Sequence, residues 1–168
     1  MKQLKAYTIV GFFFVLIFGT LFHFLYEWTN QCYIVGFFAP VSESVWEHMK
    51  LLFFPMLLYI FFMIWRFNER FPCVIAAFFF GNLAGTWCIP LLYYAYTSVL
   101  GTNILFIDLA IFAISTGIAF YLAYKFTLSC RLQPYTIFLC ILICMVLLCF
   151  LVFTYHPPAF AMFSSAHS

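Results

Sequence analysis

Five long apolar segments divide the chain, and short stretches with charged residues, glycine or proline separate them. The segments run over residues 6–26, 45–65, 72–96, 103–125 and 135–155. Each is about 20 residues long, the length that a helix needs to cross a hydrocarbon core of about 30 Å. The pattern predicts an all-α, polytopic transmembrane helix bundle of about five spans, forming a single transmembrane domain over residues 1–168.

The segment 28–40 departs from this pattern. It is apolar and aromatic, but it is too short to cross a membrane. Backbone at membrane depth that is not helical must be covered by protein. We therefore expect an interfacial or re-entrant segment after the first span, packed over the bundle.

The composition makes a bilayer the expected solvent. Hydrophobic residues form 67% of the chain and charged residues only 7%, whereas a soluble domain has about 25% charged residues. The lipid bilayer is therefore the first predicted partner. A net charge of +2 does not predict a nucleic-acid partner.

The basic residues predict an orientation. With five spans, all but one of the basic side chains fall on the same side: Lys2, Lys5, Arg66, Arg70, Lys125 and Arg131. Basic residues are enriched in cytoplasmic loops. We thus predict a multi-pass protein of the cell membrane with a cytoplasmic N-terminus and an outer C-terminus.

Polar residues gather on the predicted outer side. Residues 23–50 contain two of the four histidines and three of the five acidic residues. Because charge near hydrocarbon is costly, such a group is a candidate functional site. The candidate polar cluster consists of His23, Glu27, Glu43, Glu47, His48 and Asp108.

Part of this cluster has the residue types of a metal site. His23 and Glu27 are one helical turn apart, and His48 comes from the second span. Histidine and carboxylate ligands suit a divalent metal such as zinc, so His23, Glu27 and His48 are the predicted ligands, with Glu43 or Glu47 completing the site. Asp108 is a candidate second-shell partner, proton carrier or counter-ion.

Other features have purely structural interpretations. Ser44 and Glu47 match a capping box at a helix start, and Glu47 could also pair with Lys50. Gly81 and Gly85 form a GxxxG motif that favours close helix packing inside the bundle. The seven cysteines show no metal or redox spacing and predict no disulfide framework.

Two blocks of sequence resemble a known family. These are HFLYEW at residues 23–28 and PVSESVWEHMKLLFFP at residues 40–55, followed by YHPP at 155–158. They resemble a family of small bacterial integral membrane proteins that is known only as a domain of unknown function. Ser42 stands where we expect that family's asparagine. The resemblance implies a multi-pass bacterial membrane protein and supplies no activity.

Three functional interpretations remain. The first is a non-enzymatic membrane protein whose outer cluster binds a metal ion or small polar ligand, as a carrier, sensor or accessory subunit. The second is a membrane-embedded, metal-dependent hydrolase in which Glu43 or Glu47 is the general base. The third is a structural membrane protein with no ligand site. A protein partner or a homo-oligomer is compatible with each.

Overall fold

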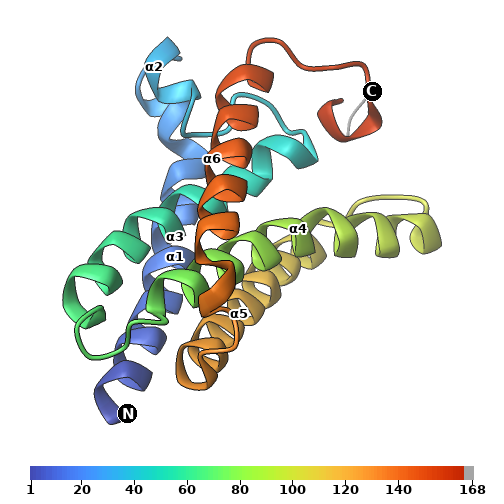
Figure 1. The fold of residues 1–168 in the computed structure, drawn as a ribbon. Helices are drawn as coiled ribbons and strands as arrows, with labels where there is room; N and C mark the ends of the chain where they lie inside the picture. The colour runs from blue at the N-terminus through green and yellow to red at the C-terminus, as the bar shows by residue number, and fades with distance from the viewer. Residues whose placement is uncertain (165–168) are drawn as a thin grey trace.

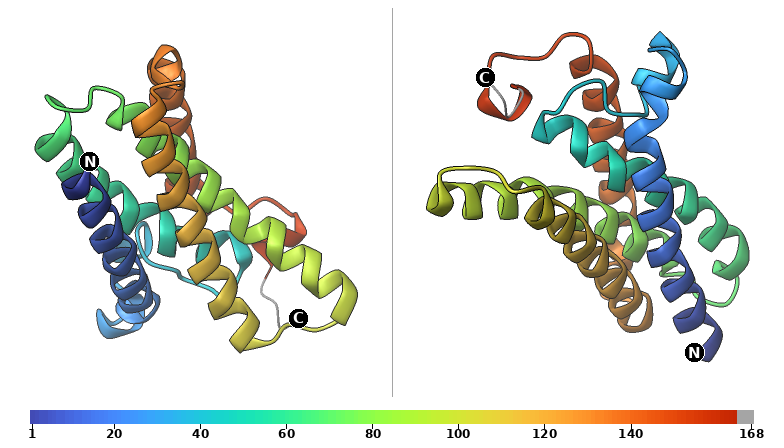
Figure 2. Two further views of the ribbon diagram at one scale, coloured as in Figure 1. Left: turned by 90° about the horizontal axis from the view of Figure 1, so that it is seen from below. Right: turned by 180° about the vertical axis from the view of Figure 1, so that it is seen from behind.

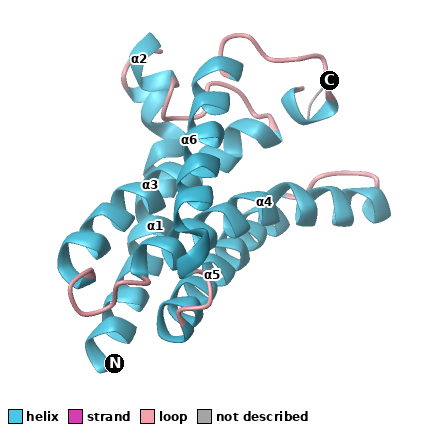
Figure 3. Ribbon diagram, in the orientation of Figure 1, coloured by secondary structure: helices cyan, strands magenta, loops and turns pink. Residues whose placement is uncertain are grey.

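The computed structural model describes residues 1–164, and within them it has helices and no strand (Figures 1 and 3). The long helices are α1 (Lys2–Trp28), α3 (Val45–Phe67), α4 (Val74–Leu100), α5 (Leu105–Ser129) and α6 (Thr136–Phe153). Shorter elements are α2 (Tyr33–Gly36) and the 3₁₀ turns η1 (Gln133–Tyr135) and η2 (Ala161–Phe163). Among the described residues, five helices are long and apolar enough to cross a membrane. The prediction of an all-α bundle is confirmed.

The helices run past several of the predicted span limits. α4 continues to Leu100 and stops at Gly101, whose φ of 71° is left-handed, a common glycine helix stop. α5 continues to Ser129 and stops at Cys130, which is also left-handed, with φ 54°. Hydropathy located the breaks between helices, but a left-handed backbone conformation sets where these two helices end.

α3 occupies the centre of the bundle (Figure 2). α1 and α4 both pack against it, and α5 packs against α4 and α1. Near the start of α3, the rings of Trp46 and Phe53 contact Phe150 of α6 at centroid distances of 4.7 and 5.1 Å. The first turns of α3 are buried on nearly every face, polar residues included, whereas Leu58, Phe61 and Trp65 in its second half form an exposed apolar face.

α4 and α5 approach each other closely. A Cβ atom built on Gly81 would lie 2.5 Å from the Ala119 carbonyl oxygen, and one on Gly85 would lie 2.6 Å from the Ala119 Cβ. The GxxxG motif therefore packs inside the bundle, as predicted. The neighbouring Asn82 is fully buried and donates from Nδ2 to the Phe53 carbonyl of α3 at 3.3 Å.

A disulfide joins Cys73, just before α4, to Cys130, just after α5. The expectation of no disulfide was wrong for this pair. The cysteines are 57 residues apart and have no recognisable spacing, so only the antiparallel packing of α4 on α5 brings them together. The other five cysteines are free thiols.

The alternating helix directions give the bundle two unlike ends (Figure 1). The N-terminus and the α3–α4 and α5–α6 connections lie together at what we call the basic end. Its basic residues are Lys2, Lys5, Arg66, Arg70, Lys125 and Arg131. α2 and the start of α3 lie at the opposite, polar end, where the α4–α5 pair diverges from α1 and α6.

Candidate functional site

The first feature of the polar end is a buried lysine. Lys50 is fully buried, and its ammonium group donates to Glu47 Oε2 at 2.7 Å. It also donates to the Gly36 carbonyl at 3.0 Å and to Thr154 Oγ1 at 2.6 Å. A lysine has three donors, and all three are used here. The charge is thus paired and fully hydrogen-bonded, which a buried charge requires.

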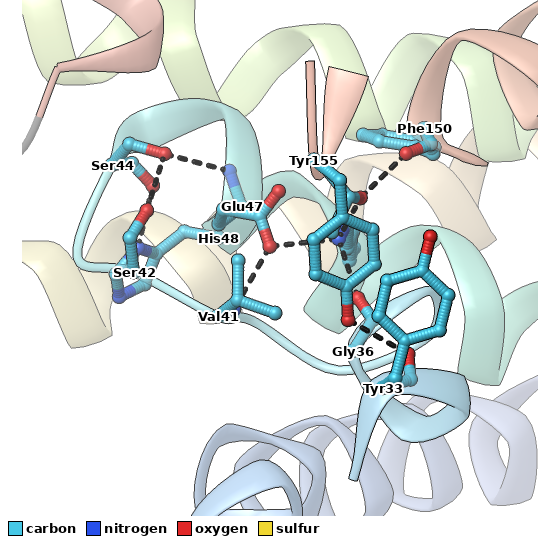
Figure 4. Close-up of polar contacts among 11 residues, drawn as sticks. Tyr33, Gly36, Val41, Ser42, Ser44, Glu47, His48, Phe150 and Tyr155 are labelled. Carbon is cyan, nitrogen blue, oxygen red and sulfur yellow. Dashed lines mark hydrogen bonds and ion pairs between the residues drawn. The ribbon is translucent and has the colours of Figure 1, made fainter. Parts of the chain in front are cut away.

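Glu47 combines two of the predicted structural roles (Figure 4). Its backbone N–H donates to Ser44 Oγ at 3.3 Å, as in a capping box. Its carboxylate, however, reaches back past Ser44 and accepts from the Val41 N–H at 2.9 Å as well as from Lys50. With only 4% of its side chain exposed, Glu47 is the counter-ion of Lys50 and holds the preceding loop at Val41, while Ser44 caps the helix. The Glu47 carboxylate is turned away from the metal candidates.

The same network fixes the segment that follows α1. α2 presents the Gly36 carbonyl to Lys50, and the Tyr155 hydroxyl donates to the Tyr33 carbonyl at 2.7 Å (Figure 4). The rings of Tyr33 and Tyr155 stack with centroids 4.2 Å apart. The segment 28–40 therefore packs over the bundle, as expected.

The second feature is a group of three possible metal ligands from different segments. His23 comes from α1, Glu43 from the connection before α3, and His48 from the first turns of α3. His48 Nε2 lies 3.3 Å from Glu43 Oε2, and His23 Nε2 lies 3.9 Å from Glu43 Oε1. One ligand atom from each residue lies within 4.8 Å of the others. We call His23, Glu43 and His48 the histidine–glutamate cluster.

A backbone contact fixes how His48 faces this cluster. His48 Nδ1 lies 2.9 Å from the Ser44 carbonyl oxygen. A carbonyl only accepts, so Nδ1 must carry the hydrogen. The other nitrogen, Nε2, then faces the carboxylate of Glu43 with a lone pair unless a proton or a metal ion lies between them. The ring is therefore oriented as metal-ligating histidines usually are, with the second nitrogen donating to a carbonyl.

The cluster is accessible. The side chains of His23 and His48 are 30% and 33% exposed, and that of Glu43 is 59% exposed. Ser42, at the family's expected asparagine position, donates to Ser44 Oγ at 3.2 Å and so supports the helix start beside the cluster. An ion can reach these three residues, whereas the network around Lys50 is closed.

The two remaining candidate residues lie beside this cluster. Glu27 interacts electrostatically with His23 but is not one of the three gathered ligands. Asp108 interacts electrostatically with His48, and its carboxylate accepts a hydrogen bond from the Tyr96 hydroxyl of α4. Lys50 pairs with Glu47 and not with Asp108, so Asp108 is held within the α4–α5 pair.

Sequence reasoning missed Thr154 and Tyr96 as parts of the polar layer. Thr154 lies in a predicted span without any neighbouring charge, and Tyr96 is one of 11 tyrosines. Their partners, Lys50 and Asp108, are 104 and 12 residues away in the chain. The only signal was indirect, since an intramembrane charge requires a polar partner on a neighbouring helix.

The family model described as a family of unknown function (DUF6512) matches residues 1–168, so the chain belongs to this family. No curated protein matches the chain significantly. No solved structure matches it significantly either.

Proposed function

We propose that this protein is a non-enzymatic, multi-pass membrane protein that binds a divalent metal ion such as Zn²⁺ at its polar end. His23, Glu43 and His48 are the proposed ligands, and the protein acts as a metal carrier, sensor or accessory subunit. Glu43 replaces Glu27 in the ligand set expected from the sequence, because Glu43 is the carboxylate that lies between the two imidazoles.

The observation that carries the proposal is the position of the Glu43 carboxylate. One of its oxygens faces His23 Nε2 and the other faces His48 Nε2. With Nδ1 of His48 committed to Ser44, Nε2 faces the carboxylate and can hold either a proton or a metal ion between them. A metal ion in that position can also contact the imidazole of His23, which a proton cannot do.

The distances suit a zinc site once the side chains close in, since one ligand atom from each residue lies within 4.8 Å of the others. Zinc–nitrogen and zinc–oxygen bonds of about 2.1 Å in a tetrahedron place ligand atoms about 3.4 Å apart. The pair of His48 and Glu43 already lies at 3.3 Å, and that of His23 and Glu43 at 3.9 Å. Three protein ligands leave a fourth position for water or for an exchanging ligand, which suits transient binding.

The surroundings favour binding over hydrolysis. A metal hydrolase needs a carboxylate beside the bound water as a general base. Glu47 accepts from Lys50 and Val41, and Glu43 is itself a proposed ligand. Neither of the two expected bases is therefore available. We place the polar end on the outer face of the membrane, following the basic residues at the opposite end.

The test is the metal content of detergent-purified protein after loading with Zn²⁺ and desalting, measured by mass spectrometry. We expect about one zinc per chain in the wild type and loss of that zinc in the His23→Ala, His48→Ala double variant. The control is His156→Ala, which removes an exposed histidine outside the cluster and should retain the metal. A wild type without stoichiometric zinc, or a double variant that keeps it, would refute the proposal.

A further inference from the structure

A groove of about 450 Å³ runs between α1 and α5 toward the basic end. This volume is within the range of about 300–1,000 Å³ typical of ligand sites. Its lining is almost entirely apolar and comes from the two helices, with one amine among them: Lys5, Thr8, Ile9, Phe12, Gly117, Phe120, Tyr121 and Tyr124. The groove is independent of the histidine–glutamate cluster.

A glycine creates the space in the groove. A Cβ atom built on Gly117 would meet only the ring of Phe12, at 3.8 Å. By contrast, Gly11 on α1 lies directly against Tyr59 and Phe120, where a Cβ would be 2.3 and 2.6 Å from ring carbons. The two helices are thus in tight contact beside Gly11 and apart beside Gly117, which leaves an apolar slot.

The charge at the groove identifies its occupant. Lys5 lines the groove, and the Lys125 ammonium lies 5.9 Å from the ring centroid of Tyr121, another lining residue. Within residues 1–164, neither lysine forms an ion pair with an acidic side chain. Two exposed, unpaired ammonium groups beside an apolar slot match a molecule with an anionic head and a hydrocarbon tail.

We infer that the groove between α1 and α5 binds an anionic phospholipid, with an acyl chain beside Gly117 and the phosphate held by Lys5 and Lys125. The helices are long enough to span a bilayer, so lysines near their ends lie at the depth of lipid head groups. Basic pockets between transmembrane helices bind anionic head groups in this way. A second groove, lined by Trp87, Leu91 and Met162 among others, has no charged lining residue and gives no such indication.

The test is native mass spectrometry of the intact protein titrated with phosphatidylglycerol or with phosphatidylcholine. We expect the wild type to bind phosphatidylglycerol more tightly. The Lys5→Gln, Lys125→Gln double variant should lose this preference, with roughly fivefold weaker phosphatidylglycerol binding for each lysine removed. Lys2→Gln is the matched control, because Lys2 is exposed on the same helix but does not line the groove.

The Gly117→Leu variant tests the acyl-chain half of the inference. Its side chain fills the slot, so binding of both lipids at this site should be lost. Since both lysine changes are at exposed positions, folding of the double variant can be checked by circular dichroism. The inference is wrong if the wild type binds the two lipids equally, or if the double variant keeps its preference for phosphatidylglycerol.

Discussion

Lys50 donates a hydrogen bond to Thr154, although the two residues are 104 positions apart in the chain. The Thr154 hydroxyl in turn donates to the Phe150 carbonyl one helical turn earlier, at 2.6 Å. Lys50 also holds the end of α2 through Gly36. One buried ammonium group therefore connects α3, the end of α6 and the segment after α1, and it fixes the framework that carries the histidine–glutamate cluster.

The first prediction concerns this ammonium group. Lys50→Met preserves most of the side-chain volume but leaves the Glu47 carboxylate buried without its counter-ion. Breaking a buried pair in this way costs about 3–5 kcal/mol, so we expect a clear fall in the melting temperature measured by intrinsic fluorescence in detergent. Adding Glu47→Gln should restore part of the loss, since it removes the unpaired charge. An unchanged melting temperature in Lys50→Met would show that the pair contributes no stability.

The second prediction separates the two candidate glutamates of the metal site. Glu43→Gln removes the carboxylate that lies between the imidazoles, so we expect zinc affinity to fall by at least tenfold in a calorimetric titration. Glu27→Gln, which removes the carboxylate that the sequence pattern predicts as a ligand, should bind zinc within about threefold of the wild type. Both glutamine variants keep the shape of the side chain and change one charge. The opposite ranking would return Glu27 to the ligand set.

The third prediction concerns the close packing of α4 on α5. Gly85→Val would drive side-chain atoms into Ala119 and Ser115, because even a Cβ would lie 2.6 and 2.9 Å from their atoms. Overpacking of this kind typically costs about 1–3 kcal/mol, and we expect a lower melting temperature. Gly117→Ala is the control, since a Cβ there would meet only the Phe12 ring, at an ordinary contact distance of 3.8 Å, and alanine is the better helix former. Equal melting temperatures for the two variants would contradict this packing.

The sequence predicted the helices and the GxxxG contact because these depend on local properties. Span length, hydropathy and a spacing of four residues can all be read within one segment. Glu47 was likewise predicted as a cap, because Ser44 lies three residues before it. Even so, its carboxylate bonds to the Val41 N–H and not to that of Ser44, since the path of the preceding loop decides which donor lies within reach.

The composition of the cluster could not be predicted to the residue. His23 and Glu27 are neighbours on a helix surface, and this local relation led to the expectation that they share a metal. Glu43 lies between His23 and His48 because the segment from 29 to 44 folds back over the bundle, where Gly36 and Lys50 hold it. The disulfide was missed for the same reason, since its partners meet only through the α4–α5 packing.

The last prediction uses that disulfide to determine the orientation in the membrane. The bond lies at the basic end, which the proposed orientation puts in the cytoplasm, whereas disulfides persist mainly in oxidising compartments. We therefore expect Cys73 and Cys130 to be thiols in the cell and to pair by oxidation during purification. Alkylating intact cells before lysis and mapping the labelled cysteines by mass spectrometry should find both modified, while aerobically purified protein should contain the disulfide.

Cys32 at the polar end is the internal control for the orientation. A membrane-impermeant reagent added from outside should label Cys32 and should not label Cys130. A pair that is already oxidised in the cell, together with a Cys32 that only a membrane-permeant reagent labels, would invert the proposed orientation and place the histidine–glutamate cluster in the cytoplasm.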